Sequence, residues 1–470
     1  MMWNFSSFGN NTALIDDSGK KYTYSELDTA GKQLADAVGK RCLVFSFCLN
    51  SPGSVIGYTS FINHGIVPAL LSAHLEKDLR KDLIETYKPS FIWAPSDMEG
   101  EFDGHEKVYS AYDYVLMKAD NGSDAKLHED LALLLTTSGS TGSPKFVRQS
   151  YENIKSNTES IIEYLNIDSS ERAITTLPMN YTYGLSIINT HLMAGAAIIL
   201  TEKTLMQKEF WELFKKEEAT SFGGVPYTYE MLDRLRFFRM DLPSLRYMTQ
   251  AGGKLTPELH KKFAEHSIEN GREFIVMYGQ CEATARMGYL PAEYSVAKYG
   301  SMGIAIPGGK LLIIDVDGKE IEEPEVSGEL VYEGPNVTLG YAECAEDLSK
   351  GDERNGRLET GDMAKRDEDG FYYIVGRKKR FLKIFGNRTN LDEVDRMIKT
   401  EFGNVDCTSG GVDDCLYIFV TDDNLVEPVK KFVVEKTGFH HSAIKVVKLD
   451  EIPKNDSGKV LYKELEKYYS

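Results

Sequence analysis

Residues 131–145 read LALLLTTSGSTGSPK, an apolar run that passes directly into Ser, Thr and Gly residues and ends at Lys145. The apolar part has the length of a buried strand. Small residues let backbone N–H groups turn toward an anion, hydroxyls add donors, and a lysine supplies a mobile positive charge. The pattern predicts a strand followed by a phosphate-binding loop, although it does not fit the Walker A spacing. A flexible linker is the alternative, but a linker rarely follows a buried strand so directly.

Strand-like and helix-like segments alternate on both sides of this loop. Ser54–His64 and Tyr151–Leu165 look helical, whereas Ser90–Ala94 and Ala173–Leu177 read as short buried strands. Such alternation favours parallel sheets covered by helices. After about residue 300 the strands are shorter and broken by Gly and Asp, which predicts an antiparallel or barrel-like subdomain.

The last part of the chain has a different pattern. We expect helices at Leu391–Thr400 and Val429–Lys436, the second one with Pro428 suited to its first position, and a strand at Cys415–Val420. The fold class is therefore α/β. A large N-terminal domain, residues 1–376, contains the α/β sheet layers and the small barrel-like subdomain. A hinge at 377–379 leads to a small α+β C-terminal domain, residues 380–470.

Composition limits the classes of function. The 470 residues include 54 Lys and Arg against 72 Asp and Glu, a net charge of -18. Such an acidic surface repels phosphate backbones, so nucleic-acid binding is not expected. The six cysteines form no CxxC pair and are too sparse for a disulfide scaffold, which favours free thiols in a reducing compartment. No apolar run reaches the ~18 residues of a membrane span, and the N-terminus does not resemble a secretory signal. We expect a cytoplasmic protein.

Further short motifs follow in order, and each is weak alone because a plain turn or a surface loop would explain it. They are GGK at 252–254, YGQCE at 278–282, TGD at 360–362, GR at 376–377 and GK at 458–459. Together with the loop near residue 140, their order and spacing resemble the adenylate-forming (AMP-binding) superfamily. That superfamily includes acyl-CoA synthetases, adenylation domains of peptide synthetases and firefly-type luciferases. The resemblance runs from TYSEL at residue 23 to GK at 458.

The resemblance implies a role for each matching residue. The phosphates of ATP would be held by Thr137, Ser138, Gly139, Ser140, Thr141, Gly142 and Lys145. The adenine would be bound by Gly252, Gly253, Lys254, Tyr278 and Gly279. Mg²⁺ would be bound by Glu282, the ribose side by Asp362 and Arg377, and the reacting phosphate by Lys459, with Thr141 and Lys145 also catalytic. The C-terminal domain would be mobile about Lys379, and Gly386 would line the tunnel for the thiol.

The resemblance also implies a pocket for a carboxylic acid. Its walls would be Tyr181, Tyr183, Gly223, Gly224, Tyr227, Met277 and Met287. Thr182 stands where peptide synthetases carry the Asp that binds an α-amine, which disfavours a free amino acid. The tyrosine hydroxyls favour a small, polar or aromatic acid. Arg286 would pair with a second carboxylate or a hydroxyl-rich substrate, or would be a structural salt-bridge partner, the commoner role of a lone arginine.

The implied activity is ATP-dependent ligation of an acid through an acyl-adenylate, with release of pyrophosphate and transfer to a thiol. The acyl acceptor would be CoA, as in an acyl-CoA synthetase, or the phosphopantetheine of an acyl carrier protein. The acidic surface slightly favours CoA. Cys281 replaces the usual Thr, and a thiol is a weaker donor, so a nucleotide-binding protein with weak or no ligase activity is an alternative. A luciferase-type oxygenase, which shares the adenylation step, is another.

Overall fold

The computed structural model describes residues 2–102, 104–119, 122, 126–136, 145–385, 387–403, 405–454 and 460–469. The chain divides into two compact units. Among the described residues, the first unit comprises those up to 136, 145–311 and 332–358, and the second comprises those in 312–331 and 359–469. The proposed hinge falls where strand β21 (Tyr372–Arg377) ends and a short 3-10 helix, Lys378–Arg380, begins. The mobility of the segment after it stays a prediction.

One sheet of the first unit has a parallel centre. Its order is β19 (Gly340–Ala342), β9 (Phe146–Ser150), β8 (Leu131–Thr136), β4 (Val67–Ser72), β3 (Leu43–Cys48), β5 (Phe91–Pro95), β7 (Tyr114–Ala119) and β6 (His105–Ala111). Strand β3 pairs in parallel with β4 and β5, and β4 pairs in parallel with β8. Strands buried on both faces read as continuous apolar runs, which explains LVFSFC in β3 and LALLLT in β8.

A second sheet of this unit is also parallel at its centre. Its order is β16 (Ile304–Ala305), β15 (Gly288–Tyr289), β14 (Glu273–Tyr278), β13 (Tyr247–Gln250), β12 (Ser221–Gly224), β10 (Arg172–Ile174), β11 (Ala197–Ile199), β1 (Thr12–Ile15) and β2 (Lys21–Thr23). Parallel pairs run from β14 through β13 and β12 to β10. The prediction of parallel α/β layers is therefore confirmed. The residues after β12, β13 and β14 emerge at one edge of this sheet.

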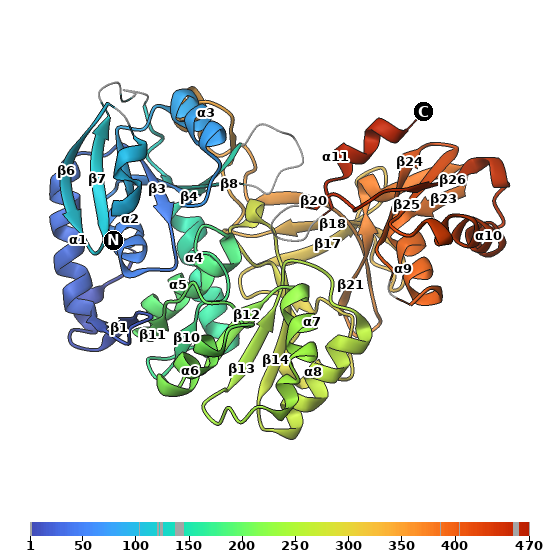
Figure 1. The fold of residues 1–470 in the computed structure, drawn as a ribbon, viewed down its shortest axis with the longest axis horizontal. Helices are drawn as coiled ribbons and strands as arrows, with labels where there is room; N and C mark the ends of the chain where they lie inside the picture. The colour runs from blue at the N-terminus through green and yellow to red at the C-terminus, as the bar shows by residue number, and fades with distance from the viewer. Residues whose placement is uncertain are drawn as a thin grey trace. The chain divides into compact units, whose positions relative to one another are not determined.

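Helices cover these sheets. They are α1 (Tyr24–Val38), α2 (Pro52–Asn63), α3 (Lys77–Tyr87), α4 (Tyr151–Leu165), α5 (Thr182–Ala194), α6 (Lys208–Lys216), α7 (Pro226–Arg234) and α8 (Pro257–Glu269). The TYSEL motif begins α1, because Thr23 and Glu26 form a capping box that satisfies free backbone N–H groups. Helix α1 packs on α2, α4 packs on α5, and α8 lies against β14 (Figure 1).

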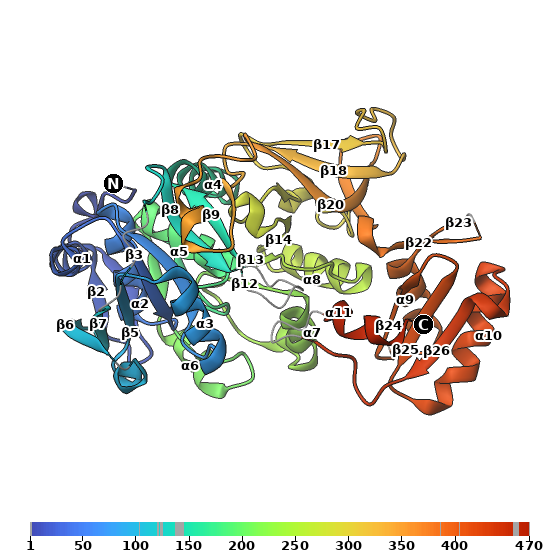
Figure 2. The same cartoon turned by 90° about the horizontal axis from the view of Figure 1, so that it is seen from above.

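The second unit holds most of an open sheet and a small α+β part. The sheet order is β17 (Lys310–Ile314), β18 (Gly328–Glu333), β20 (Arg357–Arg366) and β21, and the β20–β21 pair is antiparallel. The remaining elements are β22 (Phe381–Ile384), β23 (Asn387–Asn390), α9 (Leu391–Glu401), β24 (Cys407–Val412), β25 (Cys415–Val420), α10 (Val426–Thr437), β26 (Ile444–Lys448) and α11 (Tyr462–Leu465). Helix α9 packs against β24 and α10 against β26 (Figure 2).

The prediction for the start of α10 was wrong. The helix begins at Val426, two residues before Pro428, so Pro428 is its third residue. The first N–H groups of a helix have no partner within the helix, so a proline in the first turn removes no hydrogen bond there. The proline therefore marks the first turn without fixing the first residue.

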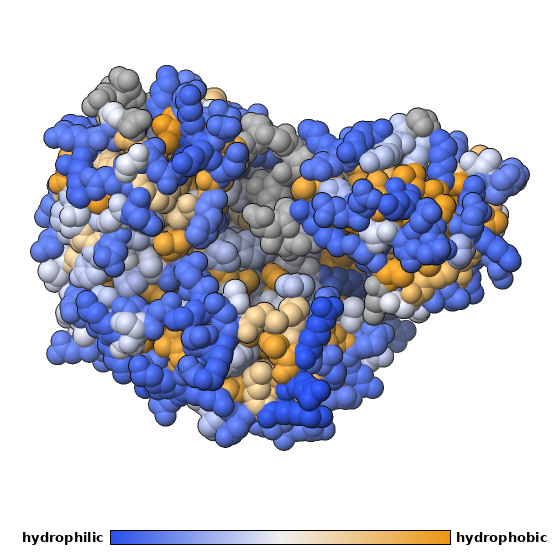
Figure 3. All heavy atoms as spheres, viewed as in Figure 1, coloured by the Kyte–Doolittle hydropathy of each residue, from blue (hydrophilic) through white to orange (hydrophobic). Residues whose placement is uncertain are grey.

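Hydrophilic side chains cover much of the face of each unit that Figure 3 shows, with scattered apolar patches between them. Scattered apolar side chains are ordinary on folded proteins. Among the helices that the structure describes, none combines the length and the apolar character needed to cross a membrane.

Candidate active site

Glu282 lies just beyond the carboxyl end of β14, in a short 3-10 helix formed by Cys281–Ala283. The hydroxyl of Tyr341, from the edge strand β19, donates a hydrogen bond of 2.6 Å to its Oε1 atom. Burial, together with this neighbouring carboxylate, raises the pKa of the Tyr341 phenol well above its usual range. Tyr341 therefore stays protonated and holds the carboxylate of Glu282 in one orientation.

Two cations flank the ring of Tyr341. The Nζ atom of Lys145 lies 3.9 Å from the ring centroid, and the guanidinium carbon of Arg354 lies 4.7 Å from it. Lys145 immediately precedes β9, and both Lys145 and Glu282 contact Tyr341. A positive charge over an aromatic face is attracted to it. The arrangement gathers two positive charges beside one carboxylate, which suits a polyanionic ligand.

The backbone of Glu282 is fixed by the segment before β20. Its carbonyl oxygen accepts hydrogen bonds from the backbone N–H of Thr338 at 3.0 Å and from Nη1 of Arg354 at 2.9 Å. Arg354 also donates to the Thr338 hydroxyl at 2.6 Å. Sequence reasoning assigned no role to Thr338, Tyr341 or Arg354. The stretch GPNVTLGY contains the first two, and its match to the superfamily was the available signal.

Gly279 has a steric reason to be glycine. A Cβ atom at this position would lie 1.8 Å from the carbonyl oxygen of Ala285. The chain must therefore pass this close for Tyr278 and Glu282 to stand at the end of β14. Tyr278 is half-buried, and its hydroxyl accepts a hydrogen bond of 3.2 Å from Gln280. Its ring has the partial exposure that stacking on a base requires.

The GGK turn after β13 lies beside Tyr181. Gly252 has a φ of +82°, which favours glycine, and a Cβ there would lie 2.7 Å from the Tyr181 hydroxyl. Gly253 and Lys254 are exposed. The structure thus brings the turn predicted for adenine next to one predicted wall of the acid pocket.

Several acid-pocket residues come together on α5, β12 and β14. Tyr181, Tyr183 and Met277 belong to one apolar cluster. The Tyr183 hydroxyl lies 2.7 Å from the hydroxyl of Thr249, and burial raises its pKa to about 12. A Cβ at Gly223 would lie 2.8 Å from that Tyr183 hydroxyl, so the glycine makes room for the ring.

The other three predicted wall residues lie differently. Gly224 lies close to Thr228 of α7. A Cβ atom at Gly224 would lie 2.7 Å from the Thr228 methyl group. Tyr227 is 61% exposed on α7. Met287 is fully buried, and its backbone N–H donates to the Tyr278 carbonyl at 2.8 Å.

In the second unit, Asp362 and Arg377 are partners across β20 and β21. Nε of Arg377 lies 3.2 Å from Oδ1 of the buried Asp362, while most of the arginine side chain is exposed. Thr360 accepts a hydrogen bond from the Asp362 N–H at 3.1 Å, which fixes the turn. The TGD and GR motifs, 15 residues apart, are thus neighbours in one sheet.

Some predicted residues are beyond what the structure describes. The side chain of Lys379 is outside the described part, and so are the whole residues Thr137, Ser138, Gly139, Ser140, Thr141, Gly142, Gly386 and Lys459. Their roles stay predictions.

The carboxylate of Glu282 fits a magnesium ion. No group of three or more His, Cys, Asp or Glu side chains gathers as a metal cage among the described residues. Mg²⁺ commonly binds through one or two carboxylates together with substrate phosphates and waters, rather than in an all-protein cage. The Glu282 carboxylate, oriented by a tyrosine that Lys145 also contacts, is suited to this mode of Mg²⁺ binding.

Comparisons with known proteins agree with this geometry. Residues 2–342 match the family model described as AMP-binding enzyme. The peroxisomal OPC-8:0-CoA ligase 1 of Arabidopsis thaliana is 30% identical over 352 residues, which is 72% of this chain and 64% of that ligase. The match therefore spans less than two thirds of that relative's length.

Two further similarities extend over more of the chain. The 2-succinylbenzoate–CoA ligase of Bacillus cereus is 27% identical over 432 residues, which is 88% of this chain and 85% of the ligase. The structure of O-succinylbenzoate coenzyme A synthetase from Bacillus subtilis in complex with AMP superposes with a TM-score of 0.78 at 23% identity, over 97% of this chain and 95% of that one. This confirms the expected fold class. Because the family model covers most of the sequence, the chain belongs to the AMP-binding enzyme family.

Proposed function

We propose that the chain is an ATP-dependent carboxylic acid ligase that forms an acyl-adenylate, releases pyrophosphate and transfers the acyl group to the thiol of CoA. The observation that carries the proposal is the cluster of Glu282, Tyr341, Lys145 and Arg354. A carboxylate held in place beside two cations suits the phosphates of a metal-bound nucleotide. Packing of the protein core alone does not require this cluster of charged side chains.

The first half-reaction is an electrostatic problem. The oxygen of the acid attacks the α-phosphorus of ATP, the bond from that phosphorus to the bridging oxygen breaks, and pyrophosphate leaves. Two anions must approach, and charge increases on the phosphoryl oxygens. Lys145 and the predicted contribution of Lys459 would neutralise that charge where it develops. Removing one such preorganised contact typically lowers the rate by about 10²–10³.

Glu282 would hold Mg²⁺, which would supply further positive charge to the phosphate oxygens. Tyr341 keeps the Glu282 carboxylate oriented, and Arg354 fixes its backbone. These residues therefore position the ligand of the metal before ATP arrives.

The second half-reaction needs a thiol to attack the adenylate, with AMP as the leaving group. By family resemblance, Lys459 leaves the site and a thiol path opens through rotation about Lys379. A Lys379→Pro variant, with a stiff φ at the hinge, is expected to slow thioester formation more than adenylate formation. Wild-type rates of both half-reactions would contradict this hinge.

The direct test is pyrophosphate release with ATP and Mg²⁺ across a broad panel of carboxylic acids, with and without CoA. The expected result is release that depends on particular acids, rises with CoA and is lost in Lys459→Ala. The matched control is Lys454→Ala, because Lys454 lies in the same segment and pairs with Asp406 at the surface. If a phosphopantetheinylated carrier protein stimulates pyrophosphate release and CoA does not, the acceptor is the carrier protein and not CoA. Silence with every acid would reject the ligase.

Cys281 favours a second candidate, a nucleotide-binding protein with weak ligase activity. It is partly exposed at the start of the Cys281–Ala283 turn, where relatives of the superfamily carry threonine. A Cys281→Thr variant distinguishes the two. A gain of about tenfold or more in pyrophosphate release would mark the natural protein as a weakened ligase, whereas an unchanged rate means that the thiol does not limit adenylation.

The compartment we propose is the cytoplasm. None of the six cysteines, all of them described by the structure, takes part in a disulfide bond, which is typical of a reducing compartment.

A further inference from the structure

Arg286 is a buried cation beside two residues of the predicted acid pocket, Met277 and Tyr183. It lies in the segment between the Cys281–Ala283 turn and β15, and it is 2% exposed. Two buried amides fix its backbone, because Nδ2 of Asn157 and Nδ2 of Asn336 donate to its carbonyl oxygen at 2.9 and 3.1 Å. The direction in which its side chain leaves the backbone is therefore set by the fold.

The guanidinium has neutral partners. Its Nη1 atom lies 3.1 Å from the Tyr164 hydroxyl and 2.9 Å from the sulfur of Met277, and its carbon lies 5.0 Å from the ring centroid of Tyr183. Its Nε atom is buried and makes no hydrogen bond. Met277 and Tyr183 are two of the residues predicted to wall the acid pocket, so the guanidinium contacts that predicted wall.

The other buried arginines in the described part of the chain provide a comparison. Each of them forms an ion pair: Arg80 with Glu101, Arg148 with Glu353, and Arg380 with Asp392 and Asp395. No ion pair between described residues includes Arg286. A buried charge is expensive unless it is paired. The missing partner of Arg286 is therefore expected to come from a ligand.

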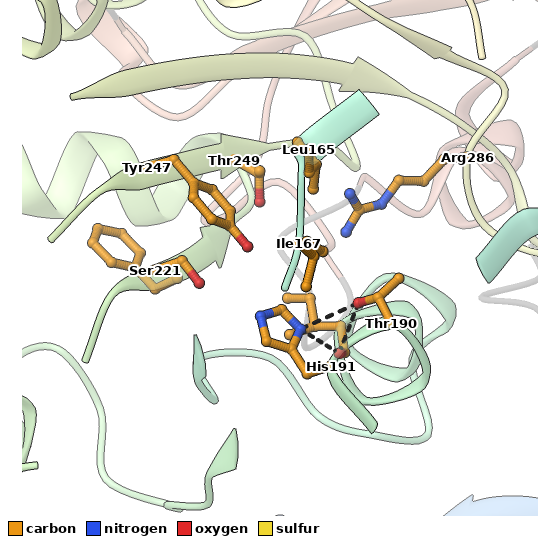
Figure 4. A pocket seen from close by; sticks show the side chains of 10 residues that line it. Leu165, Ile167, Thr190, His191, Ser221, Tyr247, Thr249 and Arg286 are labelled. Atoms are coloured by element: carbon orange, nitrogen blue, oxygen red, sulfur yellow. Dashed lines mark hydrogen bonds between the residues drawn. The ribbon is translucent and has the colours of Figure 1, made fainter. Parts of the chain in front are cut away.

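A small cavity with a mostly apolar lining lies in front of this guanidinium, and polar side chains border it at several points. It has a volume of about 10 Å³, close to the space of one water molecule or one carboxylate oxygen. Figure 4 shows the side chains of Tyr247 and Thr249, both of β13, and of Arg286 directed into it, with His191 of α5 at another side. The Tyr247 hydroxyl and Nε2 of His191 are also buried without a hydrogen bond. Two unsatisfied donors, Nε of Arg286 and the Tyr247 hydroxyl, therefore belong to residues that line the cavity.

The charge around the cavity is positive. Burial lowers the pKa of His191 to about 4, and its Nδ1 lies 2.8 Å from the Ile187 carbonyl, so the ring is neutral and carries its proton on Nδ1. Glu171 acts electrostatically on Tyr247 without lining the cavity; its carboxylate pairs with Arg246 and accepts a hydrogen bond from Thr220. No carboxylate therefore lines the cavity among the described residues.

We propose that Arg286 binds a second carboxylate of the acid substrate, and that the substrate is therefore a dicarboxylic acid. The inference rests on the proposed ligase function. The reacting carboxylate is a poor partner for Arg286. It loses its negative charge when it becomes the acyl group of the adenylate, and the buried guanidinium would then have no charged partner. A distal carboxylate stays ionised through both half-reactions. It accepts hydrogen bonds from the guanidinium and from the Tyr247 hydroxyl, which are both donors.

The test compares matched acids in the wild-type protein. Malonate, succinate, glutarate, adipate and the phthalates are each assayed beside their monoamide, which has the same shape but lacks the second charge. Pyrophosphate release gives kcat/KM, and calorimetry without ATP gives the dissociation constant of each acid. A site that pairs with a particular group strongly rejects an analogue that lacks this group. We therefore expect kcat/KM for at least one diacid to exceed that of its monoamide by about 100-fold or more.

The variant arm uses Arg286→Gln. The ratio of kcat/KM for the diacid over its monoamide is expected to fall by at least about tenfold, and calorimetric binding of the diacid is expected to weaken. The matched control is Arg80→Gln, a buried arginine of the same unit that pairs with Glu101 away from the pocket; it should keep the wild-type ratio. The wild-type comparison needs no variant and stands if Arg286→Gln does not fold.

The outcomes separate the two proposals. Activity with monocarboxylic acids or monoamides equal to that with diacids overturns the diacid inference and leaves the ligase standing. An unchanged ratio in a folded Arg286→Gln protein also overturns it. Silence with monoacids and diacids alike rejects the ligase, and the diacid inference with it.

Discussion

The hydroxyl of Tyr341 lies 2.6 Å from Oε1 of Glu282, although the two residues are 59 positions apart in the chain. The tyrosine comes from an edge strand of one sheet, and the glutamate follows the last parallel strand of the other. The contact therefore joins the two sheets of the first unit at the place where the nucleotide is expected. The relationship makes Tyr341 a positioning residue rather than a catalytic one.

A Tyr341→Phe variant removes this hydrogen bond and keeps the ring between Lys145 and Arg354. A hydrogen bond to a charged group contributes about 1.5–3 kcal/mol, so we expect pyrophosphate release to fall about tenfold and the Mg²⁺ concentration for half-maximal rate to rise. Titration of Mg²⁺ at saturating ATP measures both. Tyr299→Phe, an exposed tyrosine, serves as the control, and an unchanged Mg²⁺ dependence in Tyr341→Phe would contradict the positioning role.

Gly279→Ala tests the close approach at the end of β14. The added Cβ would lie 1.8 Å from the Ala285 carbonyl oxygen, which the backbone can relieve only by moving. Overpacking of this kind destabilises by about 1–3 kcal/mol. The urea midpoint should fall, and activity should fall more than stability because Glu282 moves with the turn. Gly100→Ala, where nothing lies within 4 Å, should change neither; equal midpoints for both variants would refute the steric account.

Two buried histidines predict how stability depends on pH. Burial lowers the pKa of both His191 and His260 to about 4, against 6.5 for an exposed histidine. Between pH 6.5 and 4 the unfolded chain therefore binds more protons than the folded protein, so the free energy of unfolding falls as the pH falls through this window. Each histidine contributes up to about 3 kcal/mol to that loss.

The measurement is the urea midpoint at several pH values between 4.5 and 6.5. His260→Gln should show a shallower dependence than the wild type, whatever its stability at neutral pH. The exposed His441 is changed to Gln as the control and should keep the wild-type slope. Identical slopes in the two variants would show that the pKa of His260 does not differ between the folded and the unfolded protein.

Asp362→Asn tests the role that the resemblance gives to the TGD motif. The resemblance has the two ribose hydroxyls of ATP donate hydrogen bonds to the Asp362 carboxylate. The neutral amide of asparagine is a weaker acceptor, so the KM for ATP should rise about tenfold while the fold is kept. Glu329→Gln removes the neighbouring 2.6 Å contact with Lys378 in the same sheet and should leave the KM nearly unchanged. A higher KM in both variants would point to disturbance of the sheet instead.

Local signals in the sequence predicted much of the fold. The capping box at Thr23 and the apolar periodicity after it predict α1, and the run at 131–135 predicts β8, because these patterns depend on neighbours within a few residues. The start of α10 was misplaced, since a proline is tolerated at more than one position of a first turn.

The candidate site could be predicted only in part. Glu282 and Asp362 stand in recognisable motifs. The contact of Arg354 with the Glu282 carbonyl spans 72 residues, and no local pattern encodes such a pairing. The surroundings of Arg286 could not be predicted from the sequence either. The sequence favoured a structural salt bridge for it, and only the packing shows that its described neighbours carry no negative charge.

Strand β9 obtains its outer neighbour late. The partner strand β19 pairs Gly340 with Arg148, and the buried Arg148 side chain donates to the carbonyl of Tyr341, 193 residues further along. While the nascent chain leaves the ribosome at about 5–20 residues per second, the edge of β9 stays open for roughly 10–40 s. An open strand edge is a template for pairing with another chain. Translation speed and chaperone access during that interval should therefore decide how much of this protein is recovered in folded form.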